Sequence, residues 1–321
     1  MKLYGKEPAL AALHAMCSSG RLPHSFLLYG DAGVGKKTLA QYLCGLLLCV
    51  GAEKPCGACK PCRNLAAGQH PDVITVAHSG KLGGFSVQTI RELCADAYIV
   101  PNNGDRKIYL LTDADAITVQ AQNALLKLVE EPPDFTYFIF TASSKNVFLE
   151  TILSRVSSIG VPPCTEQQCR EALSALGYGE TEITGAVSAF HGNIGQCVAY
   201  LSDEAMQQAV ALTKQLADSI MNRDEYSLLA ALTACSADKA VLRTVLQLLD
   251  RHVRDALILR NGGSACVGCY PAGAMEYAKR VTLAQCEKQH GAILRACTDL
   301  EGNVSPALAV SALCAEIMQE K

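Results

Sequence analysis

Short apolar runs alternate with helix-like segments along the first half of the chain. The runs are rich in β-branched and aromatic residues, and they cover Ser25–Tyr29, 72–77, Lys107–Leu111 and 137–141. The segments between them predict helices, because apolar residues recur three and four positions apart; they cover Lys36–Leu48, 87–97 and 119–129. Strands that alternate with helices predict a parallel sheet with helices on its faces, so this half should be an α/β domain.

The pattern changes after Pro162 and Pro163, since no later segment predicts a strand. Helical periodicity covers 166–201 and then continues from 203 to the end of the chain. Glycine-rich breaks interrupt it at 177–179, 192–195, 261–263 and 302–306. We therefore predict three domains: an α/β domain at 1–163, a small helical domain at 164–203 and a larger all-helical domain at 204–321.

Composition narrows the class of protein. Half of the 321 residues are apolar and 18% are charged, which is typical of a compact globular protein and excludes a disordered tail or a fibre. The net charge of −3 gives no global attraction to nucleic acid, so any DNA contact requires a local patch or a partner. The N-terminus lacks the features of a secretory signal, and the longest apolar run, 43–50, is too short to span a bilayer. These features predict a cytoplasmic protein.

A phosphate-binding loop follows the first predicted strand. Its sequence is Gly30-Asp31-Ala32-Gly33-Val34-Gly35-Lys36, the first seven positions of the Walker A pattern, between a strand and a helix. Glycines let backbone N–H groups turn towards a phosphate, and the lysine reaches the terminal phosphates. The nucleotide-binding candidates are Gly30, Gly33, Val34, Gly35, Lys36, Lys37 and Thr38.

The loop departs from the pattern where a hydroxyl should hold Mg²⁺. That position carries Lys37, and Thr38 stands one residue late, turned by about 100° on the helix. The second metal-organising motif departs as well, because Thr112 and Asp113 follow the strand 107–111 where an Asp-Glu pair is expected. Asp113 and Asp115 either contact a metal or, alternatively, cap the helix near Thr118 or lie in solvent. Both departures predict weak or absent hydrolysis.

A cysteine cluster predicts a structural zinc site. Sixteen cysteines occur in the chain, and those placed singly among apolar residues read as small buried hydrophobes: Cys17, Cys94, Cys197, Cys235, Cys297 and Cys314. In contrast, Cys49, Cys56, Cys59 and Cys62 lie within fourteen residues, with spacing typical of tetrahedral zinc. Cys44 is the rival fourth ligand. Free surface thiols or a redox switch would also be consistent with this spacing.

Prolines and glycines predict a knuckle rather than a helix for the cysteine segment. A four-thiolate site leaves no open position on the metal, so the zinc should be structural. A second pair, Cys266 and Cys269, has no partner cysteines nearby in the sequence, and we interpret it as incidental.

Together these motifs resemble the clamp-loader branch of the AAA+ ATPases, over roughly residues 5–200. Further matching segments are Leu22-Pro23-His24-Ser25, His70-Pro71-Asp72, Asn123-Ala124-Leu125-Leu126-Lys127, Glu130-Glu131-Pro132-Pro133 and Leu153-Ser154-Arg155, where Val156 replaces the family's Cys. The resemblance implies a P-loop AAA+ sheet domain with a zinc knuckle, then a helical lid and an all-α collar that holds a pentamer together. An AAA+ regulator unrelated to replication is a weaker alternative.

Within that branch the chain is most similar to the delta-prime family of bacterial DNA polymerase III, with the gamma/tau motor family as the alternative. The motor subunits carry Thr after the P-loop Lys, an Asp-Glu pair and a lid Arg; here Lys37, Thr112-Asp113 and an Arg-free 192–195 stand instead.

The resemblance therefore implies a stator that hydrolyses little or no ATP. It also implies that Arg155 reaches a neighbour's γ-phosphate as an arginine finger. The implied cofactors are structural Zn, with ATP or ADP possible and Mg uncertain. The implied partners are the gamma/tau and delta subunits and, through the complex, the sliding clamp and primer-template DNA.

Overall fold

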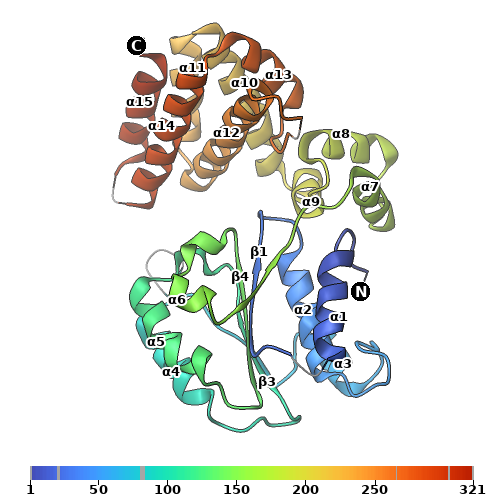
Figure 1. The fold of residues 1–321 in the computed structure, drawn as a ribbon. Coiled ribbons are helices and arrows are strands. Elements are labelled where there is room, and N and C mark those ends of the chain that lie inside the picture. The colour runs from blue at the N-terminus through green and yellow to red at the C-terminus, as the bar shows by residue number, and fades with distance from the viewer. Residues whose placement is uncertain (1, 20–21, 80–83, 265, 303, 320–321) are drawn as a thin grey trace. The chain divides into compact units, whose positions relative to one another are not determined.

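The computed structural model describes residues 2–19, 22–79, 84–264, 266–302 and 304–319 (Figure 1). The chain divides into two compact units, Met1–Cys164 and Thr165–Lys321. The second unit is continuous across residue 203, where we predicted a boundary between a lid and a collar. That boundary stays a prediction. In the described residues, no helix has the length and apolar character needed to cross a membrane.

A five-stranded parallel sheet forms the centre of the first unit. Its strands, in spatial order, are β2 (Val73–Thr75), β3 (Lys107–Leu111), β4 (Thr136–Ala142), β1 (Ser25–Tyr29) and β5 (Ser157–Gly160). The strand β1 pairs on both sides, with Leu27 opposite Phe140 of β4 and opposite Ser158 of β5. The parallel sheet of the predicted α/β fold is thus confirmed.

Alternating side chains build one apolar core on each face of the sheet. In β1, Phe26 and Leu28 belong to one core and Leu27 belongs to the other. The same alternation in β3 sends Ile108 and Tyr109 to opposite faces. Strands buried on both faces read as continuous apolar runs, which explains why these strands stand out in the sequence.

Helices cover both faces of the sheet. Figure 1 shows α1 (Glu7–Ser18) and α2 (Lys36–Leu48) on one side and α4 (Val87–Asp96) and α5 (Val119–Glu130) on the other. The remaining short helices are α3 (Lys60–Ala66), α6 (Glu150–Leu153), and the 3₁₀ turns η1 (Ala114–Ala116) and η2 (Lys145–Val147). Hydroxyl side chains begin the two helices on the second face, because Ser86 accepts the N–H of Thr89 and Thr118 accepts the N–H of Ala121.

Besides the short elements η1, η2 and α6, the sequence patterns miss three elements of this unit. The strand β5 has two serines and a glycine, so no apolar run marks it, and its pairing with β1 creates it. The helix α1 buries Ala9 and Leu13 but was not predicted. The knuckle prediction is wrong for the end of the cysteine segment, because α3 begins there with Pro61 in its first turn, a favourable position for proline.

The second unit is helical throughout its described residues, as predicted. Its helices are α7 (Glu166–Ala175), α8 (Glu180–Phe190), α9 (Ile194–Ser202), α10 (Glu204–Asn222), α11 (Glu225–Cys235), α12 (Lys239–Arg260), α13 (Pro271–Arg280), α14 (Leu283–Glu301) and α15 (Pro306–Met318). The predicted glycine-rich breaks are confirmed. Three further breaks were missed, and in each the next helix begins at a side chain that accepts a backbone N–H: Asp224, Asp238 and Thr282.

Burial bears out the hydrophobe interpretation for only some of the singly placed cysteines. Cys197, Cys235 and Cys314 are buried, while Cys94 and Cys297 are partly exposed. Cys17 is exposed, so the prediction is wrong there. Its position near the end of α1 accounts for the difference, because a residue on the outer side of a surface helix faces solvent whatever its polarity.

The helix α12 lies at the centre of the second unit and contacts α10, α13 and α14. It carries His252, which is only 1% exposed. The imidazole stacks on Tyr270 at a centroid distance of 5.7 Å and meets Tyr277 edge-on at 5.3 Å. Burial in this aromatic setting lowers the pKa of His252 to about 4.

His252 should make the second unit sensitive to acid. An unfolded histidine has a pKa of about 6.5, so between pH 6.5 and pH 4 the unfolded chain binds a proton that the folded chain does not, and stability falls as pH falls. We expect His252→Phe to remove about 3 kcal/mol of the decrease in unfolding free energy between pH 7 and pH 4. Urea unfolding followed by circular dichroism measures this difference. An unchanged pH dependence would contradict the prediction; His14→Gln, at an exposed histidine, is the control.

Candidate functional site

The predicted phosphate loop lies between β1 and α2, at the carboxyl end of β1, the strand between β4 and β5. Gly30 has φ 153°, and its N–H donates to the carbonyl of Ala142, at the end of β4, over 3.2 Å. A Cβ at Gly30 would lie 2.4 Å from the carbonyl oxygen of Val161, so no larger residue fits. Gly35, the N-cap residue directly before α2, has φ 93°, a left-handed conformation that favours glycine. The structure therefore requires these glycines for the loop.

Lys36 lies inside this loop. Its Nζ donates to the carbonyl oxygens of Gly30 and Asp31 over 2.6 Å and 2.9 Å, and the residue is 8% exposed. Burial lowers the pKa of Lys36, while the nearby Asp115 and Asp113 carboxylates act in the opposite direction. The lysine is thus held at the first turn of α2, where loop amides and the helix N-terminus favour an anion. These residues fit the phosphates of a nucleotide.

Lys37 forms an ion pair across the same edge of the sheet. Its Nζ lies 2.5 Å from Oδ2 of Asp113, and the two side chains are 61% and 50% exposed. Lys37 stands at the hydroxyl position of the Walker pattern, and Asp113 follows the end of β3. An ammonium group cannot ligate a cation, and Mg²⁺ takes oxygen ligands in near-ideal octahedral geometry. The residues at this position therefore do not fit Mg²⁺.

Side chains from the end of β4 fix both acidic residues. The N–H of Asp113, which has φ 52°, donates to the hydroxyl of Thr141 over 2.8 Å. Asp115 accepts the N–H of Ser143 over 2.7 Å and also its hydroxyl. Thr118 itself caps α5, so the alternative that an aspartate caps that helix is wrong. Both aspartates are exposed, as the solvent alternative predicted, and their carboxylates lie at the carboxyl edge of the sheet, each with a bonded partner.

Three residues of this site were not predicted from the sequence. Thr141 is the penultimate residue of β4 and Ser143 directly follows the strand, and residues at strand ends collect at the carboxyl edge of a parallel sheet. Lys6 is 4% exposed and donates to the carbonyl of Pro162. Its Cε lies 3.9 Å from the position that a Cβ on Gly35 would take, which places the lysine against the phosphate loop. No sequence motif marks Lys6.

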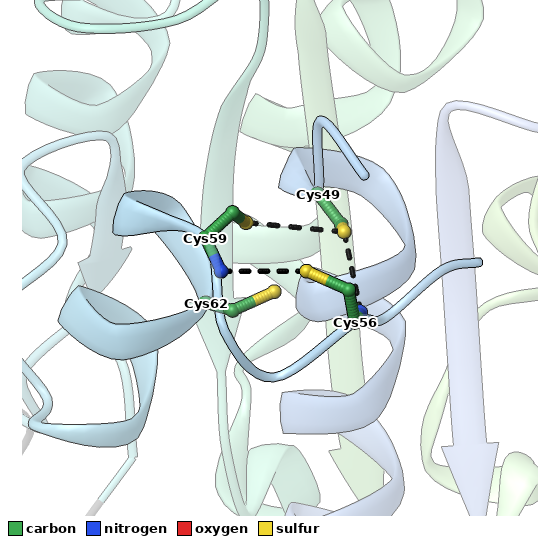
Figure 2. Close-up of side chains that lie close together, drawn as sticks. All are labelled: Cys49, Cys56, Cys59 and Cys62. Carbon is green, nitrogen blue, oxygen red and sulfur yellow. Dashed lines mark hydrogen bonds between the residues drawn. The ribbon is translucent and has the colours of Figure 1, made fainter. Parts of the chain in front are cut away.

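The four predicted zinc ligands come together at the other end of α2. The sulfur atoms of Cys49, Cys56, Cys59 and Cys62 all lie within 4.8 Å of one another, and Figure 2 shows the side chains converging. Zinc bonded to four thiolates at about 2.3 Å places them about 3.8 Å apart, close to this arrangement. Among the described residues no other group of three or more such ligands occurs, so the Cys266–Cys269 pair belongs to none. The cluster has the donor set and spacing of a structural zinc site.

Backbone N–H groups turn towards the sulfur atoms of this cluster. Those of Gly51 and Cys56 both donate to Cys49 over 3.3 Å, and that of Cys59 donates to Cys56 over 3.4 Å. Amides of Cys62 and Val50 lower the pKa of Cys59 to about 6. Such bonds favour the thiolate, which is the form that binds metal.

Cys44 lies apart from the cluster. It is fully buried in the apolar core beneath α2, and burial raises its pKa to about 12. Cys49, one residue past α2, is the cysteine that meets the other three. The geometry thus favours Cys49 over Cys44 as the fourth ligand.

Comparison with known proteins assigns the family. The family model described as "DNA polymerase III, delta subunit" matches residues 5–165. The DNA polymerase III subunit delta-prime of Escherichia coli K12 is 32% identical over 229 residues, which cover 70% of this chain and 69% of that protein. The chain belongs to the delta-prime family of DNA polymerase III subunits.

Two further comparisons of this delta-prime family member are with gamma/tau-related proteins. The tau subunit of E. coli K12 is 27% identical over 263 residues, which cover 81% of this chain but 40% of tau. The solved structure of a gamma subunit-related protein from Thermotoga maritima has a TM-score of 0.52 at 14% identity, covering 95% of this chain and 98% of that one. The latter supports the fold alone.

Arg155 of this delta-prime family member lies at the surface of the first unit. It follows α6, and one guanidinium nitrogen lies 2.7 Å from Oε1 of Glu130. The other donates to the carbonyl of Thr151 over 2.8 Å and to the hydroxyl of Ser154 over 3.1 Å. These bonds hold the guanidinium beside the Glu-Glu-Pro-Pro segment, while about a third of the side chain stays exposed.

The cysteine cluster predicts one Zn²⁺ per chain. Metal analysis of protein purified under reducing conditions should find a ratio near one for wild type and for Cys44→Ala, but a ratio well below one for Cys62→Ser. The Tm of Cys62→Ser should also fall, because metal binding contributes to folding. Absence of zinc from the wild-type protein would refute the site, and its loss from Cys44→Ala would mean that Cys44 is a ligand.

Proposed function

We propose that this chain is the stator of a DNA polymerase III clamp loader. As a member of the delta-prime family it is a clamp-loader subunit. In the proposed role it binds the gamma/tau motor subunits and the delta subunit, hydrolyses little or no ATP itself, and supplies Arg155 to the ATP site of a neighbour. It would act on the sliding clamp and primer-template DNA through the complex, consistent with its net charge of −3.

The ion pair between Lys37 and Asp113 is the observation that carries the non-hydrolysing role. Hydrolysis in P-loop ATPases needs a metal held by a loop hydroxyl and an acidic residue. Here the hydroxyl position carries an ammonium that is bound to the nearest acid, and Thr112 replaces the other acid. The hydroxyl position of the P-loop and the acidic pair after β3, which together hold the metal in active ATPases, are thus both altered. This favours a stator over a motor.

The environment of Arg155 supports its role in a neighbour's site. Its ion pair with Glu130 joins two partly exposed side chains, and such pairs contribute little to stability. Arg155 can therefore leave Glu130 and bind a phosphate at a small cost in free energy. A guanidinium also binds a phosphate through two parallel N–H groups, which makes it suited to stabilise transferring phosphoryl charge.

The alternative is an active motor of the gamma/tau type. The intact glycines, Lys36 and the identity with tau favour it. In that role Thr38 and an aspartate would have to hold the metal. Turnover by the isolated chain separates the two roles.

We expect the purified chain to hydrolyse ATP no faster than its Lys36→Ala variant. The reason is that neither metal-organising motif is complete, so removal of Lys36 should have no activity to abolish. Steady-state phosphate release in excess Mg²⁺ measures this. Turnover in wild type that disappears in Lys36→Ala would reclassify the protein as a motor.

We further expect Arg155→Ala to slow hydrolysis by the assembled complex. An arginine finger accelerates hydrolysis about 10³-fold or more, so hydrolysis at the one ATP site that Arg155 serves should slow by about that factor. The total ATP turnover of the complex should fall by the amount that this site contributes. The control is Arg170→Ala, at an arginine that also pairs with a surface glutamate, Glu180, over 2.9 Å. DNA-stimulated ATPase assays test this role. Gel filtration first verifies that the variant and wild-type complexes have the same size, so that a lower rate does not reflect failed assembly. Wild-type turnover in the Arg155→Ala complex would exclude it.

A further inference from the structure

The ion pair at the phosphate loop occupies the position at which other P-loop proteins hold a metal. In those proteins Mg²⁺ joins three partners: the loop hydroxyl, an acidic residue after a later strand, and the nucleotide phosphates. Lys37 extends from the hydroxyl position, and its Nζ lies 2.5 Å from Asp113 after β3. The ammonium group of Lys37 therefore lies between the hydroxyl position of the loop and the acidic residue after β3, where the metal would lie in those proteins.

The ammonium of Lys37 is suited to contact the third partner as well. A lysine ammonium has three N–H donors, and its bond to the Asp113 carboxylate uses one. The side chain is 61% exposed, so a ligand can reach it. Asp113 is itself held by Thr141, whose hydroxyl accepts its N–H over 2.8 Å. Lys37 is thus pinned from one side and accessible from the other.

The charge of Lys37 at the metal position disfavours a bound cation there. Lys36 lies inside the loop and Lys6 lies against Gly35, so three lysines gather at one end of α2. Three carboxylates lie near Lys36 as well, those of Asp31, Asp113 and Asp115. A divalent cation would face the charge of Lys37 at short range, while a metal-free phosphate would gain from it. A polyphosphate without magnesium carries more negative charge than its magnesium complex. It therefore gains more from the ammonium groups of Lys36 and Lys37.

We propose that Lys37 replaces the divalent cation, so that this P-loop binds a nucleoside triphosphate or diphosphate as a metal-free anion. The inference rests on the proposed non-hydrolysing role, because a site without metal retains a nucleotide but does not hydrolyse it. Lys36 and the loop amides bind the phosphates, and Lys37 links them to Asp113.

Equilibrium binding of a fluorescent ATP analogue tests the proposal on the full chain. The wild-type Kd should agree within about twofold between excess EDTA and excess Mg²⁺, whereas Lys37→Met should weaken binding about tenfold in both buffers, as expected for loss of a charge-assisted hydrogen bond. The control is Lys239→Met, at an exposed lysine that begins α12, and it should bind like wild type. Thermal unfolding provides a second readout, since a bound nucleotide raises Tm, and it should do so in EDTA.

Three results would overturn the proposal: wild-type binding that requires Mg²⁺, Lys37→Met binding as tightly as wild type, or no binding by wild type in either buffer. The last would leave the stator role intact, because that role is tested separately by assembly with gamma/tau and delta and by the Arg155→Ala complex. Conversely, metal-free binding by a chain that fails to assemble would retain the nucleotide site and reject the stator.

Discussion

The parallel hydrogen bonding of β1 to β4, and of β4 to β3, determines which residues meet at the candidate site. Parallel strands bring their carboxyl ends to one edge, so the loop after β1, the polar residues after β4 and the acids after β3 lie together. The order also places β4 between the other two strands. Lys37 and Asp113 pair across this strand end, and Thr141 at its end fixes the acid.

The same sheet explains why one domain serves two sites. One face packs on α2, which begins at the phosphate loop and ends at the first cysteine of the cluster. The phosphate loop depends on glycines and on charges at the edge of the sheet, while the cysteine cluster depends on backbone amides that face sulfur. The site chemistry is therefore local at each end, and the apolar core joins the two ends.

Sequence patterns predicted the helices and strands that neighbouring residues in the sequence determine. β1, α2 and β3 end where predicted, because apolar runs, a glycine loop and helical spacing mark them. β5 could not be predicted, since pairing with β1 creates it, and the breaks before α11 and α12 depend on single capping aspartates. The cysteine ligands were found from their spacing. The pairing of Lys37 with Asp113 was not, because strand order brings together residues far apart in the sequence.

The helix α2 connects the phosphate loop to the cysteine cluster. Its thirteen residues form a rod about 20 Å long. One end presents Lys36 and Lys37, and the other leads directly into Cys49, whose N–H still bonds to the carbonyl of Gly45. A metal at the cysteines would clamp the far end of this rod, and its loss would let that end fray. With metal bound, the cysteine insertion would therefore stabilise the helix that carries both lysines, although it lies at the opposite end of α2 from them.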